Sequence, residues 1–468
     1  GGLAVGVAST KLLVRYGPTS VPRLDEASFD FTMVLFALAV AVTTAFVFGL
    51  VPAIQVSRQR PAASLQDAAR GSSGGVGRQR FRATLTVVEV ALSVSLLIGA
   101  GLLLRSFWRL QQVDPGFNVK PLMMTRVALP EAAYPDNQAK GAFSDRLLAE
   151  IRVLPGIIAA ATSSGIPLSG DNTSTEVQLP GAEARGGGQL SADWRLVSPG
   201  YFETMGIPLR GSDFSVHDPE RAAHTTIISE AMARAYWPNR DPIGQTVVLS
   251  SFGNRARTII GVAGYVRNLG LDTEPRSTVY YSTLTFSGWN PIDVVWRSAV
   301  DPASHVAAVR DIVGRLDPTV PLYNIRSLDD MVSESFAPRR FNMYLLGVFA
   351  DVALLLAAIG LFGVMAYLVA QRTREIGVRL ALGADHRDIF RLILGRGIVL
   401  AVTGAAIGVG GAFWLTRVMQ SLLFSVSTTD PGTFLAVPII LVLVAILACY
   451  VPARRAMKVD PVTALRAE

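Results

Sequence analysis

The chain has 468 residues, of which 50% are hydrophobic and only 17% are charged. Its mean hydropathy of +0.39 excludes an ordinary water-soluble domain and favours a membrane protein. Lys and Arg outnumber Asp and Glu by 43 to 36, and the single cysteine, Cys449, excludes an intrachain disulfide and a cysteine metal cluster.

Five apolar stretches reach the roughly 20 residues that a helix needs to cross about 30 Å of hydrocarbon. These predicted spans cover residues 31–55, 85–104, 344–370, 397–415 and 433–451. Residues 1–14 match the remainder of a sixth span. Because the chain starts with Gly1 inside that stretch, without a charged leader and a cleavage site, we expect it to be a fragment of a longer protein.

The two ends of the chain repeat each other at an offset of 400 residues, since Val51, Pro52 and Ala53 recur as Val451, Pro452 and Ala453. Nine of 36 ungapped positions from residue 30 to 65 are identical to residues 430 to 465. We therefore expect residues 1–70 to be the end of a first unit whose front is missing, with one partial span and one full span. A flexible, glycine-rich cytoplasmic linker, residues 71–84, follows it.

Basic residues near the spans predict the orientation of the chain. Three segments, residues 56–84, 371–396 and 452–468, hold 16 Lys or Arg and 6 Asp or Glu, and all lie on one side if the spans alternate. This side is expected to be cytoplasmic, which leaves residues 114–338 outside. Because the excess charge lies in short loops beside spans, it gives no support for nucleic-acid binding.

The second unit is expected to contain a first span at 85–107, a periplasmic core domain at 114–338 and a C-terminal domain with three spans at 344–468. Within the outer domain, residues 122–129 and 258–266 are predicted strands. Residues 137–154 and 303–316 have the periodicity of amphipathic helices. The predicted fold class is an α-helical membrane protein with a mixed α/β extracytoplasmic domain.

The sequence predicts no catalytic, cofactor-binding or metal site. It contains no Gly-x-x-x-x-Gly-Lys-[Ser/Thr] loop for ATP, and its match to Gly-x-Ser-x-Gly, residues 71–75, lies in the glycine-rich linker and not in the strand–turn–helix elbow of a hydrolase. Its histidines lack metal-ligand spacing; they are His217, His224, His305 and His386. We therefore expect a protein that is not an enzyme, and any ATP hydrolysis must come from a partner.

Two acidic residues, Glu89 and Asp351, fall within predicted spans. A carboxylate in hydrocarbon is costly, which raises the hypothesis of a proton relay. Both residues lie close to the end of a span, so we favour an interfacial position or contact with a neighbouring helix. The spacing Gly404-x-x-x-Gly408 predicts close approach of another helix.

The segment after the span 344–370 has the character of an interfacial amphipathic element, with Ile376, Leu380 and Leu382 beside Arg379. Two interpretations fit this pattern. In the first, a cytosolic protein binds the element and displaces it. In the second, the element is a linker that lies on the membrane surface and is held there by its basic side chains.

This segment, REIGVRLALGA at residues 374–384, resembles the signature of MacB/FtsX-like ABC transporter permeases. Further stretches are similar to other parts of that family. They are EVALS at 89–93, GAGLL at 99–103, DPGF at 114–117, SPGYF at 198–202, YWPN at 236–239, DPIG at 241–244, VPARRA at 451–456 and DPVTALR at 460–466. The doubled unit most resembles the duplicated permeases of acidobacteria, from which Tyr265 departs because an Asp is expected there.

The resemblance implies an FtsX-like unit of four spans in the bacterial inner membrane, with a large domain in the periplasm. It also implies a cytoplasmic ABC ATPase that binds ATP, with no cofactor on this chain. In that family the spans transmit ATPase-driven motion to the periplasmic domain. Carried onto this chain, the ATPase-coupling contact would use Arg374, Glu375, Gly377, Arg379 and Gly383.

We therefore expect a permease subunit for export, embedded in the lipid bilayer. Its further expected partners are a periplasmic adaptor or outer-membrane channel, and a second unit that pairs within one chain or as a homodimer. One alternative is an FtsX-type regulator or scaffold of periplasmic cell-wall hydrolases. Another is a proton-coupled carrier that uses Glu89 and Asp351. The sequence does not select a substrate.

Overall fold

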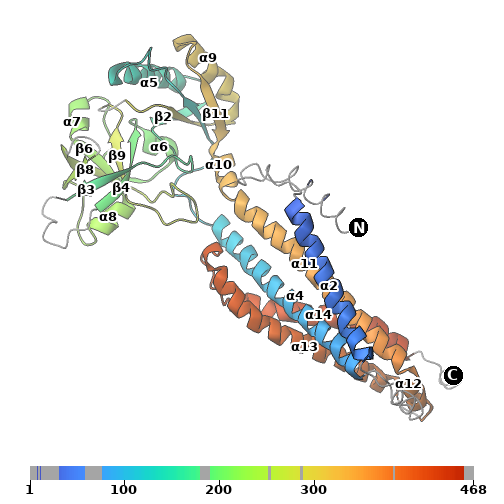
Figure 1. The fold of residues 1–468 in the computed structure, drawn as a ribbon. Helices are drawn as coiled ribbons and strands as arrows, with labels where there is room; N and C mark the ends of the chain where they lie inside the picture. The colour runs from blue at the N-terminus through green and yellow to red at the C-terminus, as the bar shows by residue number, and fades with distance from the viewer. Residues whose placement is uncertain are drawn as a thin grey trace. The chain divides into compact units, whose positions relative to one another are not determined.

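The computed structural model describes residues 8, 11, 31–57, 76–179, 190–250, 255–284, 288–382 and 385–457 (Figure 1). The chain divides into two compact units. One is helical and joins Gly1–Gln111 to Ala337–Glu468, and the other, Gln112–Phe336, contains the β-sheet. Each unit is described by itself.

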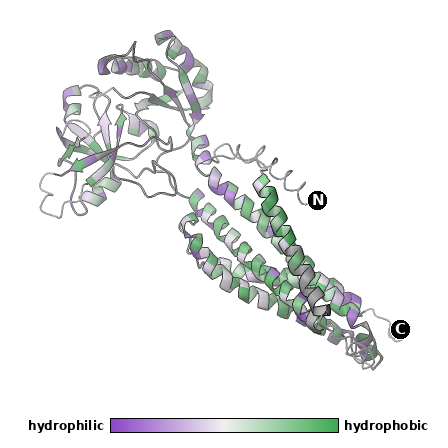
Figure 2. Cartoon of the chain, viewed as in Figure 1, coloured by the Kyte–Doolittle hydropathy of each residue, from purple (hydrophilic) through white to green (hydrophobic). Residues whose placement is uncertain are grey.

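Long apolar helices make up the helical unit, as the hydropathy colouring shows (Figure 2). They are α2 (Phe31–Ser57), α4 (Val76–Gln111), α11 (Ala337–Gln371), α13 (His386–Val418) and α14 (Pro431–Met457), with the short α12 (Thr373–Ala381) and η4 (Gln420–Leu422). Four of them are long and apolar enough to cross a membrane, and α2 has a shorter apolar stretch at Phe31–Thr43. Each of the five predicted spans is thus a helix, and four of the five are confirmed as candidate membrane spans. Residues 1–14, apart from Ala8 and Lys11, lie outside the described residues.

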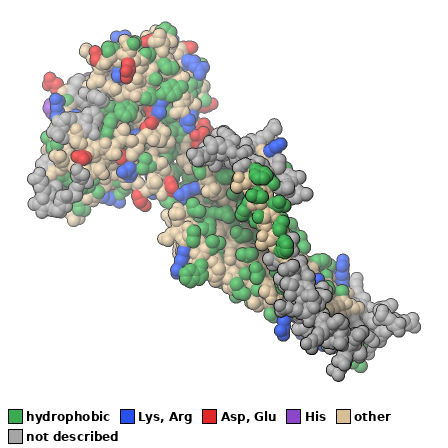
Figure 3. Space-filling model, viewed as in Figure 1, with side chains coloured by type: hydrophobic (Ala, Val, Ile, Leu, Met, Phe, Trp, Pro, Cys, Tyr) green, Lys and Arg blue, Asp and Glu red, His purple; other side chains and the backbone are tan. Residues whose placement is uncertain are grey.

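Within the helical unit, α4 packs against α11, α13 and α14. Val90, Val94, Ile98 and Leu102 recur every fourth residue and are fully buried, because these positions share one helix face. Apolar side chains on the outer faces of the helices stay exposed, as a bilayer would allow; Figure 3 shows them gathered on one face of the unit.

Two glycines allow α13 to approach α4 closely, as their spacing predicted. A Cβ atom on Gly404 would lie 2.6 Å from Val90 Cγ1, and one on Gly408 would lie 2.5 Å from the Ala91 carbonyl oxygen. The Ser95 hydroxyl uses this proximity to donate a hydrogen bond of 2.9 Å to the Gly408 carbonyl.

The second unit is a mixed α/β domain, which confirms the predicted fold class. Its strands are β1 (Leu122–Val127), β2 (Ile157–Ser163), β3 (Ser174–Gln178), β4 (Leu190–Val197), β5 (Leu209–Gly211), β6 (Thr225–Ser229), β7 (Thr246–Leu249), β8 (Arg255–Ala263), β9 (Thr278–Ser282), β10 (Ile292–Ser298) and β11 (Leu322–Ser327). Its helices are α5 (Asn137–Arg152), α6 (Tyr201–Met205), α7 (Pro219–Ala223), α8 (Glu230–Tyr236), η3 (Pro302–His305), α9 (Val306–Leu316) and α10 (Leu328–Ser335).

The strands form an open arm and a closed ring. In the arm, β11, β1, β10 and β2 pair in that order, all antiparallel. In the ring, β4, β3, β7, β8, β6 and β9 follow one another, and β9 returns to β4 through a parallel pairing from Asp193↔Thr278 to Val197↔Ser282. A single pair, Ser163↔Val197, joins the arm to the ring.

Helices α5 and α9 cover the arm with their apolar faces. Phe143 and Leu147 of α5 pack with Val309 and Val313 of α9 over Trp296 of β10. The predicted helix 303–316 needs one correction, because its first turn is the 3₁₀ turn η3. Asp301 accepts a hydrogen bond from the Ala303 N–H and caps this tight turn, and the α-helix begins only at Val306.

Two further predictions concern β8 and Tyr265. The predicted strand 258–266 ends at Ala263, because Gly264 leaves the sheet and donates its N–H to the Pro208 carbonyl. Tyr265 stands where an Asp was expected. The guanidinium carbon of Arg234 lies over its aromatic ring, 4.5 Å from the ring centroid.

Candidate functional site

Helix α12 connects the ends of α11 and α13 and is amphipathic. Ile376 is only 5% exposed and belongs to one apolar cluster with Met365 of α11 and Ile389 of α13. On the same short helix, Val378 is 39% exposed and the following Leu382 is 82% exposed. One side of α12 is therefore anchored in the bundle, while apolar side chains remain available on another side.

Charged residues surround a small hollow where α12 meets α13. Glu375 accepts a hydrogen bond of 2.7 Å from Arg379, and Arg372 lies 3.9 Å from its other carboxylate oxygen. Arg396, in the third turn of α13, lines the same hollow. Two guanidinium groups thus pair with one carboxylate and a third lies nearby, which leaves net positive charge at this site.

Four of the five expected coupling residues belong to α12. Glu375 and Arg379 form an ion pair, and Gly377 and the backbone of Arg374 belong to α12. The Arg374 side chain and Gly383 lie outside the described residues. Sequence reasoning did not single out Arg396, although its position between the basic segment 371–396 and the predicted span 397–415 was a usable signal.

Glu89 lies where α4 faces α11. A Cβ atom on Gly360 would lie 2.3 Å from Glu89 Oε2, so the carboxylate occupies the space that the glycine leaves. One turn further along α4, the Ser93 hydroxyl donates a 2.9 Å hydrogen bond to the Ala353 carbonyl of α11. The structure therefore places Glu89 against a neighbouring helix.

Asp351 is not brought to the same place. It is exposed on α11, nine residues before Gly360. At 1.5 Å per residue, this spacing corresponds to about 14 Å along the helix axis. The two acidic residues therefore do not form a carboxylate pair.

The other end of α4 is attached to the segment that precedes α14. Arg105 forms an ion pair with Asp430, which also accepts hydrogen bonds of 2.9 Å from the Thr433 N–H and hydroxyl. The Ser106 hydroxyl accepts a 2.8 Å bond from the Phe424 N–H. Burial raises the pKa of the Asp430 carboxyl, but the bonds from Thr433 and the charge of Arg105 outweigh it, so this pKa lies below its usual value.

Two unbroken helices lead directly into the α/β domain. The 36-residue α4 ends at Gln111, where the next residue begins that domain, and the 35-residue α11 starts immediately after it. Each is longer than about 50 Å at 1.5 Å per residue. Because α12 follows the far end of α11, one continuous helix separates α12 from the chain segment that forms the α/β domain.

Two family models match the chain. The MacB-like periplasmic core domain matches residues 33–312, and the FtsX-like permease C-terminal domain matches residues 347–461. The first of these matches covers more than half of the chain.

The chain is also similar to parts of longer curated relatives. The chain is 25% identical over 428 residues to the macrolide export ATP-binding/permease protein MacB of Azoarcus sp. (strain BH72), covering 88% of this chain and 61% of that protein. It is 29% identical over 264 residues to the pyoverdine export ATP-binding/permease protein PvdT of Pseudomonas syringae pv. tomato. This match covers 55% of this chain and 40% of that protein. The chain therefore spans about half of the length of such relatives.

Among solved structures, the periplasmic region of MacB from Actinobacillus actinomycetemcomitans matches with 14% identity and a TM-score of 0.33. This match covers 48% of this chain and 95% of that one. The extracellular domain of the transporter YknZ from Gram-positive bacteria matches with 16% identity and a TM-score of 0.29, covering 43% and 100%.

Proposed function

Because the chain belongs to the family of permeases with a MacB-like periplasmic core domain and an FtsX-like C-terminal domain, we propose that it transmits ATPase-driven motion across the inner membrane for export. It is a multi-pass inner-membrane protein whose α/β domain lies in the periplasm. The named relatives join an ATP-binding part and a permease in one protein. These 468 residues have no phosphate-binding loop, so the ATP is bound by a polypeptide outside them.

One observation carries the proposal: α12 is anchored to the bundle through Ile376 while Val378 and Leu382 stay exposed. A cytoplasmic ATPase that binds the exposed side of α12 would move Ile376 and with it the ends of α11 and α13. The net positive charge around Glu375 would attract an acidic surface on that ATPase.

The expected coupling residues serve this contact in different ways. Glu375 holds Arg379 and Arg372 on one side of α12, and Gly377 allows close approach to the helix backbone. Arg374 and Gly383 complete the set by resemblance alone. We extend the proposal to a periplasmic adaptor or outer-membrane channel, and to a second permease unit that pairs within the chain or as a homodimer.

The test is purification of the full chain from its native host, followed by identification and assay of the bound ATPase. We expect a nucleotide-binding subunit to copurify and its ATP hydrolysis to depend on the permease. Charge reversal of Arg379 to Glu should reduce copurification, whereas Arg315→Glu, on the outer domain, serves as the matched control. Absence of any nucleotide-binding subunit, or equal recovery with Arg379→Glu and Arg315→Glu, would contradict the proposal.

The two alternatives make different predictions. Periplasmic crosslinking that recovers a cell-wall hydrolase, and neither an adaptor nor a channel, would favour the regulator. A proton-coupled carrier needs carboxylates that exchange a proton, and the separation of Glu89 from Asp351 along α11 gives no support for this. Transport that survives Glu89→Gln together with Asp351→Asn would exclude the carrier.

A further inference from the structure

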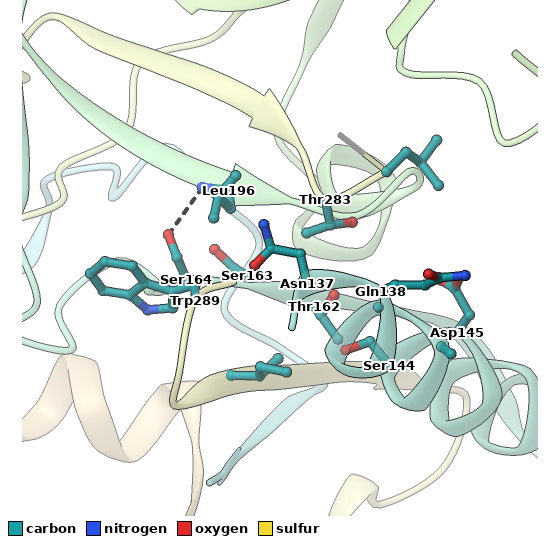
Figure 4. A pocket seen from close by; sticks show the side chains of 14 residues that line it. Asn137, Gln138, Ser144, Asp145, Thr162, Ser163, Ser164, Leu196, Thr283 and Trp289 are labelled. Atoms are coloured by element: carbon teal, nitrogen blue, oxygen red, sulfur yellow. Dashed lines mark hydrogen bonds between the residues drawn. The ribbon is translucent and has the colours of Figure 1, made fainter. Parts of the chain in front are cut away.

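A cavity of about 420 Å³ opens in the periplasmic domain between α5 and the ends of β2, β4 and β9 (Figure 4). This volume lies within the range of about 300–1,000 Å³ that small-ligand sites occupy. All of the residues that line the cavity belong to the α/β domain, so a ligand could bind there whether or not the proposed coupling exists.

One end of the cavity carries a carboxylate. Asp145 stands on α5, and Asn137 and Gln138 stand on the first turn of the same helix. All three side chains are exposed to solvent and have no hydrogen-bond partner among the residues that the structure describes. They are therefore hydrated in the free protein, and a ligand can replace the bound water.

The charge of Asp145 is only partly balanced. Burial raises the pKa of its carboxyl, and the charge of Arg152 on the same helix opposes that shift. However, Arg152 donates its hydrogen bonds to the carbonyls of Ala160 and Pro199, not to Asp145. A cation at the mouth of the cavity would therefore find an anionic group with no ion-pair partner in contact with it.

The other end of the cavity is aromatic. Trp289 is held by an edge-to-face contact with Trp194, whose ring centroid lies 5.3 Å away. Figure 4 shows Trp289 beside Ser164 at one end and Asp145 at the opposite end, with Ser163, Asn137 and Thr283 between them. The cavity is therefore elongated and polarised, with an apolar end, a middle of hydroxyl and amide groups, and an acidic end.

We propose that this cavity binds a short peptide segment with an apolar side chain at one end and a protonated amine at the other. The apolar side chain would pack against Trp289, the amine would contact Asp145, and the peptide groups would bond to the hydroxyls and to the amides of Asn137 and Gln138. A neutral sugar would use the hydroxyls and Trp289 but would gain nothing from the carboxylate.

The test uses the full chain in lipid nanodiscs and the probe peptide acetyl-Phe-Ser-Lys-amide, with isothermal titration calorimetry as the measurement. Replacing lysine in the probe by the uncharged norleucine should weaken binding about tenfold or more, because it removes a charge-assisted hydrogen bond. Replacing phenylalanine in the probe by alanine should weaken binding as well. Equal affinity for the lysine and norleucine peptides would overturn the proposal.

Variants locate the site. Asp145→Asn, which keeps the shape of the side chain, should weaken the lysine peptide about tenfold and leave the norleucine peptide unchanged. Trp289→Phe should weaken peptides with phenylalanine and spare the alanine analogue. Asp311→Asn, an exposed carboxylate on α9 away from the cavity, is the matched control. If Asp145→Asn binds the lysine peptide as well as Asp311→Asn does, the assigned role of Asp145 is wrong.

Discussion

Glu89 on α4 fills the space left by Gly360 on α11, since a Cβ atom at position 360 would lie 2.3 Å from Glu89 Oε2. The contact makes the two helices sterically complementary at one point. It also provides a test of how tightly they pack.

Gly360→Ala should destabilise the helical unit by at most about 1 kcal/mol, because the added methyl group displaces the Glu89 carboxylate, which is the flexible end of a side chain and can rotate away. The measurement is the thermal unfolding midpoint in detergent. Gly363→Ala is the control, because a Cβ atom there meets nothing within 4 Å. The double variant Glu89→Ala with Gly360→Ala should recover part of the loss, and no recovery would contradict the proposed clash.

Gly408→Ala should be more harmful than Gly410→Ala on the same helix. At position 408 the Cβ atom would lie 2.5 Å from the Ala91 carbonyl oxygen, which is backbone and cannot rotate away, whereas position 410 is open. We expect a loss of about 1–3 kcal/mol for the first variant, and a small gain for the second from the better helix propensity of alanine. Equal unfolding midpoints would show that the two helices do not pack as described.

Asp430→Ala should lower stability at neutral pH by about 1 kcal/mol or more, because it removes the side-chain acceptor for the Thr433 N–H and the partner of Arg105. The folded-state pKa of Asp430 lies below its usual value of about 3.9. The stabilisation that the ionised Asp430 side chain provides is therefore complete above its usual pKa of about 3.9, and it is lost as the pH falls through the lower folded-state pKa. The gap between the unfolding midpoints of the wild type and Asp430→Ala should stay constant from pH 7 to about pH 4 and narrow only as the pH falls further. A gap that does not narrow below about pH 4 would contradict this assignment.

Asp293→Ala should destabilise the periplasmic domain by about 1.5–3 kcal/mol, because it removes two charge-assisted hydrogen bonds from Arg126, which keeps only its ion pair with Asp171. The Arg126 guanidinium donates to both oxygens of Asp293, at 2.6 and 3.1 Å, and Asp293 is nearly fully buried. The exposed pair of Arg210 and Asp241 is the control, and Asp241→Ala should cost at most about 1 kcal/mol. Limited proteolysis and thermal unfolding would report both losses, and similar values would be a contradiction.

Much of the fold could be predicted from local patterns. Hydropathy over some 20 residues located the five long helices, because burial in lipid depends on a single continuous segment. The glycine spacing at Gly404 and Gly408 indicated the close contact, and the period of Phe143 and Leu147 located α5.

Contacts between distant segments could not be predicted in this way. Arg105 and Asp430 are 325 residues apart, and nothing in the local sequence of either selects the other. The same holds for the ring closure between β4 and β9, for Arg396 beside Glu375, and for the cavity, whose two ends come from α5 and from Trp289. These features depend on tertiary packing, which hydropathy and periodicity do not record.

The helical unit is interrupted by the whole periplasmic domain, since its two parts end at Gln111 and resume at Ala337. A ribosome that adds about 5–20 residues per second therefore needs roughly 10–45 seconds to translate the intervening residues. During this interval the buried face of α4, with Val90, Val94 and Ile98, has neither α11 nor α13 to cover it. During biogenesis α4 must therefore remain in the bilayer, alone or bound to an insertion factor, until the later helices of the bundle have been translated and inserted.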